Sequence, residues 1–453
     1  MGETKMIAVS VIVPIHNSKK YIKECLDSII QQTLSDIEIL CIDSSTDGTT
    51  DILYNYQDID NRVIVIEDKN SSYGYKMNLG IKCAKGEYIA IVESDDYIEN
   101  NMLEILYHIA YKQRLDFVKG NYEGFVDTQY ERIFGCWNRM QDEYYNQIIN
   151  LREEKNFIPY VGYNIWSGIY NTEFLKKRGI LFHESKGASY QDIGFACLTA
   201  MLGEKICFVK DRFYKYRMDN EGSSISSDQK YKCVSEEFAW LWDRMGRLGC
   251  NTEANIVHFN ISKMNSYFWN YRRLSDNYKQ KLLKELRKKE LKDFDESVLD
   301  YRIPDKQHIL KIYEGNVKEI EKEIEIEKEK RIRYTKLLQV FCDYEEIVLV
   351  CAGKYGQLIY TLMKLAECSF KVTICDNYMQ GEEFTWDGKK IISLEEAVAQ
   401  NRERYFIVAN SKNGNEIKNQ ILSLGVCKDN IYVCNYMEPS LELFQNFNKY
   451  SRK

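Results

Sequence analysis

The stretches VSVIVPIHN (residues 9–17) and GEYIAIVESDDY (residues 86–97) decide the fold. Each is an apolar run that ends in polar side chains, and a nearly continuous apolar run is typical of a strand covered on both faces. Three similar runs occur before residue 120, with helical patterns between them. This alternation predicts a doubly wound α/β sheet. The expected strands are Val9–Pro14, Ile37–Ile42, Arg62–Ile66, Glu87–Val92 and Leu115–Lys119.

Polar side chains follow these strands at their carboxyl ends, where doubly wound sheets bind their ligands. His16 follows the first strand and Asp43 the second, and the fourth leads into ESDD at residues 93–96. Three neighbouring carboxylates repel one another unless a cation lies among them. Mg²⁺ or Mn²⁺ takes one or two carboxylates and completes its shell with water and phosphate oxygens. The alternative is that Asp95 and Asp96 only cap a following helix.

A series of motifs in the first 100 residues resembles, in content and order, the family-2 glycosyltransferases of the GT-A fold. VSVIVPIHN is followed by SIIQQT (residues 28–33) and IEILCIDSSTD (residues 37–47), and KMNLG and AKGEYI (residues 76–80 and 84–89) precede the acidic run. The resemblance spans about 90 residues. It implies a GT-A nucleotide-diphospho-sugar transferase domain that works with inversion and takes Mn²⁺ or Mg²⁺ as its cofactor.

The resemblance implies a role for each matched position. Asp43 is expected at the edge of uracil or another pyrimidine, and Glu93 and Ser94 at the ribose. Asp95 is expected to ligate the metal that bridges the diphosphate, with Asp96 as a second ligand or a group behind the first. The positions implied to bind the nucleotide sugar are Pro14, Ile15, His16, Asp43, Lys76, Asn78, Glu93, Ser94 and Arg217.

The sequence departs from the family pattern at three positions. Ile42 replaces one family aspartate, so base recognition rests on Asp43 alone. Glu93 replaces the usual first aspartate of the acidic run, and its longer side chain changes how the ribose is held. Met77 replaces an arginine that many relatives carry, so Lys76 is expected to supply that positive charge.

A second region of resemblance lies on the acceptor side. NIWSGIY, which contains Trp166, leads to Gln191 and Asp192, where relatives carry an acidic pair. The resemblance implies that Asp192 is the general base, with Trp166 and Tyr190 on the acceptor side; the alternative for Asp192 is a helix cap. Arg217, which ends FYKYR, is implied to screen the charge of the departing diphosphate, and its alternative is a surface role.

Composition changes along the chain predict three regions. The second is charged and nearly free of Gly and Pro, and its run at 317–338 is expected to be a solvated helix. The third contains CAGKYG (residues 351–356), an incomplete glycine fingerprint, followed by Asp376. It resembles Rossmann-like domains attached to some bacterial sugar-modifying enzymes, and nucleotide binding and docking both stay open. The regions are a glycosyltransferase domain, 1–231, a helical connector, 232–340, and a Rossmann-like domain, 341–453.

Composition also excludes several classes of protein. A net charge of −6 lacks the basic footprint of a nucleic-acid binder. The 14 cysteines are scattered without a C-x-x-C pair, which indicates reduced thiols and a cytoplasmic location. No stretch reaches the ~20 apolar residues that span a bilayer. The basic helix expected at 279–292 has two interpretations, peripheral contact with the inner face of the cell membrane or ordinary packing on its neighbours.

These observations predict transfer of a sugar from a nucleotide-diphosphate donor, by default a UDP-sugar, to a hydroxyl of a glycan or lipid-linked acceptor in cell-surface polysaccharide synthesis. A nucleotidyltransferase is disfavoured because PIHN replaces the Gly-rich basic loop that it needs. The main alternative is an NAD-dependent oxidoreductase or nucleotide-sugar-modifying enzyme working through the third region. A binding module without activity is disfavoured by Asp43, Asp95 and Asp192. A homo-oligomer stays open.

Overall fold

The computed structural model describes residues 6–127, 132–137, 144–150, 153–154, 162–220, 228–286, 322, 344, 346–353, 356–357, 359–360, 363, 371–378, 385–386, 389–410 and 413–434. The chain divides into two compact units. The first joins residues 1–124 with 136–320, and the second joins 125–135 with 321–453. The charged helix expected at 317–338 lies outside the described residues, apart from Lys322.

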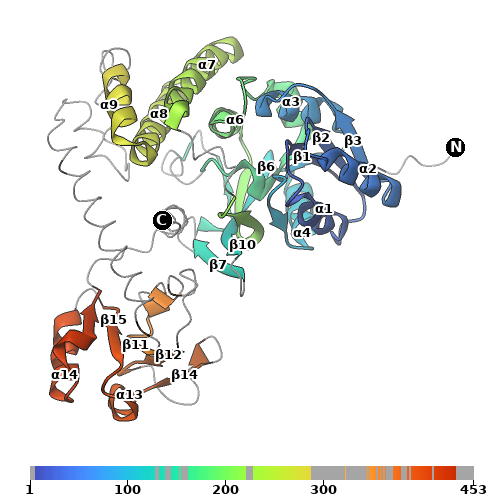
Figure 1. Cartoon of the computed structure of the whole chain (residues 1–453). Coiled ribbons are helices and arrows are strands. Elements are labelled where there is room, and N and C mark those ends of the chain that lie inside the picture. The colour runs from blue at the N-terminus through green and yellow to red at the C-terminus, as the bar shows by residue number, and fades with distance from the viewer. Residues whose placement is uncertain are drawn as a thin grey trace. The chain divides into compact units, whose positions relative to one another are not determined.

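The first unit is built on a mixed sheet with the strand order β3-β2-β1-β4-β9-β6-β10-β5; β7 lies beside β6 and β8 beside β10 (Figure 1). Strands β1 to β4 are parallel, and β9 runs antiparallel to β4 and β6. The predicted mixed α/β architecture is confirmed. The strands are β1 (Val9–Ile15), β2 (Ile37–Asp43), β3 (Val63–Glu67), β4 (Tyr88–Ile91), β5 (Tyr97–Ile98), β6 (Phe117–Asp127), β7 (Arg132–Trp137), β8 (Ile148–Ile149), β9 (Gly168–Asn171) and β10 (Ile206–Arg217).

Helices cover both faces of the parallel strands, as their burial pattern requires. On α1, Ile22, Cys25, Leu26 and Ile29 form one buried face that joins a single core with residues of α4 and the sheet. Helix α3 lies across the sheet from α1 and α4 (Figure 1). The first four helices are α1 (Ile22–Ile30), α2 (Thr49–Ile59), α3 (Tyr73–Cys83) and α4 (Met102–Gln113).

The later helices extend the first unit instead of leaving it. Helices α7 and α8 pack against α6, so the described part of the expected connector, residues 232–286, belongs to the same compact unit. On α9, Leu282, Leu283 and Leu286 are buried, so the apolar face of the basic helix packs within the protein. No helix in the described ranges is long and apolar enough to span a membrane. These helices are α5 (Thr172–Arg178), α6 (Gln191–Leu202), α7 (Cys233–Leu248), α8 (Glu253–Arg273) and α9 (Asp276–Glu285).

The second unit contains another α/β sheet, with the strand order β13-β14-β12-β11-β15-β16. All its pairings are parallel except that of β13 with β14. The carboxylate of Asp376, directly after β12, accepts a hydrogen bond from Ala352 N (2.8 Å), directly beyond β11. Its elements are β11 (Glu346–Val350), β12 (Lys371–Cys375), β13 (Thr385–Trp386), β14 (Lys389–Ile392), α13 (Leu394–Gln400), β15 (Tyr405–Val408), α14 (Gly414–Ser423) and β16 (Ile431–Val433).

Candidate active site

The loops after β1 and β2 are joined by hydrogen bonds at the edge where the parallel strands end. His16, exposed after Pro14 and Ile15, has its Nδ1 3.0 Å from the carbonyl oxygen of Ser44. Asp43 is 2 % exposed, and its Oδ1 accepts the backbone N–H of Ser45 at 3.0 Å. Its Oδ2 also accepts a hydrogen bond from the hydroxyl of Thr50 at 2.6 Å, so this carboxylate shapes the loop after β2.

Glu93 and Ser94 follow β4, in the next loop along this edge. The hydroxyl of Tyr73, at the start of α3, donates to Glu93 Oε1 at 2.6 Å. Burial raises the pKa of Glu93 to about 8, and the charges of Asp95 and Asp192 add to this shift. Ser94 is bonded to Ser18 through their hydroxyls at 2.6 Å. An ionised Glu93 at neutral pH therefore requires positive charge nearby.

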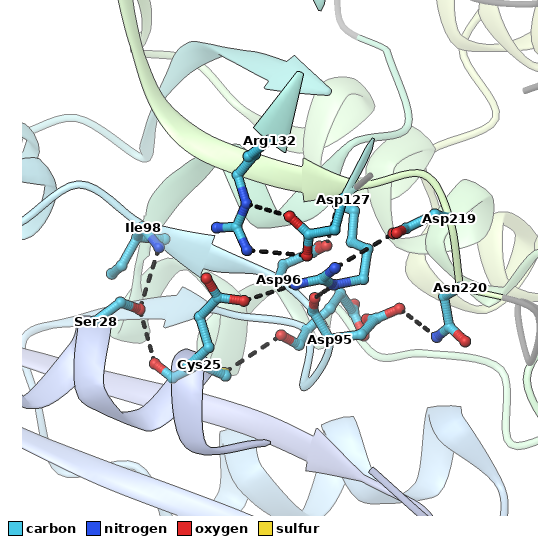
Figure 2. A network of polar contacts seen from close by, with 12 residues as sticks. Cys25, Ser28, Asp95, Asp96, Ile98, Asp127, Arg132, Asp219 and Asn220 are labelled. Carbon is cyan, nitrogen blue, oxygen red and sulfur yellow. Dashed lines mark hydrogen bonds and ion pairs between the residues drawn. The ribbon is translucent and has the colours of Figure 1, made fainter. Parts of the chain in front are cut away.

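The two aspartates of the acidic run have different surroundings (Figure 2). Asp96 is 1 % exposed, and its oxygens accept bonds from Tyr214 Oη (2.8 Å) and Arg217 N (2.7 Å). Asp95 accepts a bond from the side chain of Asn220 at 2.7 Å through one oxygen, Oδ2. Burial raises the pKa of both carboxyls. Asp96 thus holds the end of β10 in place, and Asp95 is the better placed of the two to meet a ligand.

Arg217, the last residue of β10, is buried beside the acidic run. Its Nε donates to the carbonyl oxygen of Asp95 at 3.0 Å, and its Nη2 donates to Glu24 at 2.6 Å. Its guanidinium also lies over the ring of Tyr21, 4.5 Å from the centroid. The alternative of a surface role is therefore wrong, because Arg217 is only 5 % exposed.

Lys76 and Asn78 lie on α3 but contact different parts of the unit. Lys76 is 3 % exposed and donates to the carbonyl oxygen of Ile15 at 2.6 Å. Burial lowers the pKa of Lys76 to about 8, although the negative charges of Asp43 and Glu93 act to raise it. Asn78 instead bonds Phe182 N (2.8 Å) and O (3.0 Å), so the structure places its amide on the segment that precedes α6.

Asp192 lies in the first turn of α6. Burial raises the pKa of its carboxyl to about 6. Hydrogen bonds from the first-turn amides and the positive charge of Lys119 act in the opposite direction and limit this shift. Its own charge contributes to the raised pKa values of Glu93 and Tyr73. The structure therefore brings Asp192 and the β4 loop into one site, although they are about 100 residues apart in the chain.

The start of α6 is held by Tyr190 and Gln191, through partners that the sequence pattern did not single out. Tyr190 has a left-handed backbone (φ 66°), and its hydroxyl bonds Asn270 Oδ1 and Arg273 Nε of α8, each at 2.8 Å. Gln191 donates through Nε2 to Ser185 Oγ at 2.8 Å. A glutamate there has no N–H to donate, which is a structural reason for the amide at this position.

Trp166 lies in an aromatic stack next to the acidic loop. Its ring is stacked on Tyr214 (centroids 4.2 Å apart) and on Tyr216 (5.2 Å). Because Tyr214 also bonds Asp96, the stack supports the acidic loop and leaves Trp166 partly exposed. The roles of Tyr73, Tyr214 and Asn220 had no signal in the sequence pattern.

Among the described residues, no three His, Cys, Asp or Glu side chains form a metal site by themselves. Carboxylates at the carboxyl ends of parallel strands, with another carboxylate facing them from a helix start, define a ligand-binding α/β enzyme site.

Comparison with known proteins identifies the family of this enzyme. Residues 10–164 match the model of glycosyl transferase family 2. Glycosyltransferase GlyG of Streptococcus pneumoniae is 34 % identical over 216 residues, 46 % of this chain and 70 % of that protein. The chain therefore belongs to glycosyl transferase family 2.

Two further relatives are matched over a smaller share of their own length. Poly(ribitol-phosphate) beta-glucosyltransferase of Bacillus spizizenii is 41 % identical over 26 % of this chain and 19 % of that protein. Glycosyltransferase GlyA of S. pneumoniae is 29 % identical over 46 % of this chain, which spans only 30 % of GlyA. The crystal structure of S. aureus TarS 1-349 with UDP-GlcNAc aligns with 69 % of this chain and 92 % of that one, at 20 % identity and a TM-score of 0.49.

Proposed function

We propose that this chain transfers a sugar, with inversion, from a UDP-sugar to a hydroxyl of a glycan or lipid-linked acceptor. The observation that carries the proposal is the position of Asp192, whose charge acts on Glu93 across the site. In this position Asp192 would serve as the base that transfer between a donor and an acceptor requires. A relative named as a poly(ribitol-phosphate) beta-glucosyltransferase supports a cell-surface glycan as the product.

The donor is proposed to lie along the carboxyl ends of β1, β2 and β4. There the loop with His16 and the carboxylate of Asp43 would frame the pyrimidine, and Ser94 would approach the ribose. Lys76 and Arg217 are buried cations whose charges act on Glu93 and Asp95, respectively, so both would favour the negative charge of a diphosphate at this edge. Asn78 is less suited to donor binding because its amide is bonded to Phe182.

A divalent cation, Mn²⁺ or Mg²⁺, fits the donor set. Asp96 is buried and Glu93 and Asp95 are partly buried, and desolvation raises the pKa of all three carboxyls. The charge of Asp95 adds to the shifts of Glu93 and Asp96, so a cation would favour the ionised forms of this group. Asp95 would be the ligand and Asp96 a group behind it, with phosphate oxygens completing the shell. When bound, the cation would supply charge stabilisation for the departing diphosphate.

The residues of this chain divide the chemistry between them. Asp192 would accept the proton of the acceptor hydroxyl while the oxygen forms its bond to the anomeric carbon. The bond from that carbon to the diphosphate breaks on the opposite face, which gives inversion. Lys76 and Arg217 would stabilise the negative charge that the leaving diphosphate gains. Tyr190 would hold Asp192 in place through α8.

The proposal also covers the second unit and the place of the reaction in the cell. The second unit would be a Rossmann-like domain with a docking or assembly role, which its mostly parallel sheet supports. An NAD-dependent or nucleotide-sugar-modifying reaction in that unit is the second candidate, supported by the Asp376 contact with Ala352. Reduced cysteines and a nucleotide-sugar donor favour the cytoplasm as the place of reaction.

Calorimetry with UDP tests the donor and metal assignments together. Asp95→Ala should abolish the part of UDP binding that depends on Mn²⁺, while the circular dichroism spectrum stays that of the wild type. Asp58→Ala, on the exposed face of α2, is the control and should bind as the wild type does. Equal Mn²⁺-dependent affinity in Asp95→Ala and the wild type would refute the metal assignment.

A further inference from the structure

A cavity of about 300 Å³ lies in the first unit, beside the segment that leads to α6. Asn78 of α3 faces it from one element, and Trp240 and Arg244 of α7 face it from another. Its remaining wall is the segment from Leu181 to Glu184. Glu93, Asp95 and Asp192 are not among its lining residues, so the cavity is distinct from the proposed catalytic site.

The lining suits an uncharged sugar ring. Trp240 and His183 both line the cavity and are stacked, with their centroids 5.2 Å apart and their planes 8° apart, so the flat surface that they offer a ligand is the outer face of one of these rings. The C–H face of a pyranose packs on such a surface, and its hydroxyls need donors and acceptors at the rim. Glu184 can supply acceptors and Arg244 can supply donors. Because their charges are opposite, this pair gives the lining no net charge that would attract an ion. The volume is at the low end for ligand sites, which is room for one ring and too little for a nucleoside diphosphate.

The cavity is connected to the catalytic helix by close contacts. His183 Nδ1 lies 2.9 Å from Glu237 Oε2, and Glu237 is 1 % exposed. Gly194 of α6 packs so closely on Glu237 that a Cβ there would lie 2.2 Å from Oε1. The charge of Asp192 in turn raises the pKa of Glu237. Residues that touch a ligand in the cavity are therefore packed directly on the helix that carries the proposed base.

We propose that this cavity is a secondary sugar-binding site that holds one uncharged ring of the acceptor glycan, away from the ring that reacts. The proposal rests on the proposed function for the identity of its ligand as part of an acceptor. The wall of the cavity, residues 181–184, is continuous in sequence with the acceptor-side segment that ends at Asp192. A ring bound there would keep an extended acceptor attached while its far end reaches the base.

Saturation-transfer NMR on the full-length chain tests the site directly. The probes are the methyl glycosides of glucose, galactose and N-acetylglucosamine, each added with saturating UDP and Mn²⁺ so that the donor site is filled. At least one probe should show saturation of its ring protons. Trp240→Ala should weaken this binding at least about tenfold, because it removes the flat surface. Trp242→Ala is the matched control, since Trp242 is on the same helix, is 46 % exposed and does not line the cavity.

A second variant protects the test against misfolding of Trp240→Ala. Glu184→Gln keeps an oxygen for the amide of Asn78, which now donates to Glu184 Oε1 at 2.8 Å, and should still weaken the probe severalfold. No signal from any probe in the wild type, or a signal that survives in both variants, overturns the proposal. UDP affinity in the same samples tests the proposed function separately. UDP binding without a sugar signal overturns only the proposed sugar site in the cavity. A sugar signal without UDP binding overturns only the donor assignment.

Discussion

Replacing Asp192 by Asn removes the proton acceptor while keeping the size of the side chain. The carboxyl has a pKa raised to about 6 by burial, so about nine-tenths of it is ionised at pH 7 and about one-tenth at pH 5. Only the ionised form accepts a proton, so the wild-type turnover number should fall about tenfold from pH 7 to pH 5. Asp192→Asn should lower turnover by roughly 10² at pH 7 and flatten this limb of the profile.

The assay is release of UDP from a UDP-sugar at saturating donor and Mn²⁺, with water or an added glycoside as acceptor. Saturation matters because Glu93, with a pKa of about 8, otherwise adds its own pH dependence to donor binding. Asp243→Asn changes an exposed side chain of α7; it is the control, and its turnover should match that of the wild type. A near wild-type rate in Asp192→Asn with unchanged UDP affinity would refute the base assignment, and a loss of UDP affinity would move Asp192 into the donor site.

Two further predictions concern the support around the site and the second unit. Tyr190→Phe leaves the fully buried Asn270 without its hydroxyl partner and should lower the free energy of unfolding by about 1–3 kcal/mol in a denaturant titration; a change under about 0.5 kcal/mol would show that this contact does not hold α6. A chain ending near residue 340 should keep donor hydrolysis, and its loss in a truncated protein with a native circular dichroism spectrum would contradict the independence of the first unit.

The order of the strands and helices was predictable because apolar runs and helical periodicity are local properties. The predicted strands at Val9–Pro14 and Ile37–Ile42 end one residue before β1 and β2, and the other two parallel strands, β3 and β4, differ from their predictions by one residue at each end. The predicted strand at Leu115–Lys119 overlaps only the first three residues of β6 (Phe117–Asp127), whose polar middle residues obscured its length. Paired strands in the mixed half of the sheet tolerate such residues, so periodicity does not mark the end of this strand.

The roles within the site depended on contacts between distant residues and were less predictable. Asp96 looks like a metal ligand in sequence, but its oxygens are bonded to Tyr214 and Arg217, 118 and 121 residues away. Asn78 follows the family motif, yet its amide contacts Phe182, 104 residues away. A motif specifies which residue types are present, whereas the packing of β10 and of the segment before α6 determines which atoms remain available for a ligand.

The central claim is transfer from a nucleotide-sugar donor, and a donor panel tests it most directly. UDP-, GDP- and CDP-sugars would each be incubated with the full-length chain, with Mn²⁺ or with EDTA, and the released nucleotide would be measured. We expect release of UDP from a UDP-sugar with Mn²⁺, and none with EDTA. Absence of nucleotide release from every donor, in a folded protein that also binds none of the three nucleotides, would contradict it.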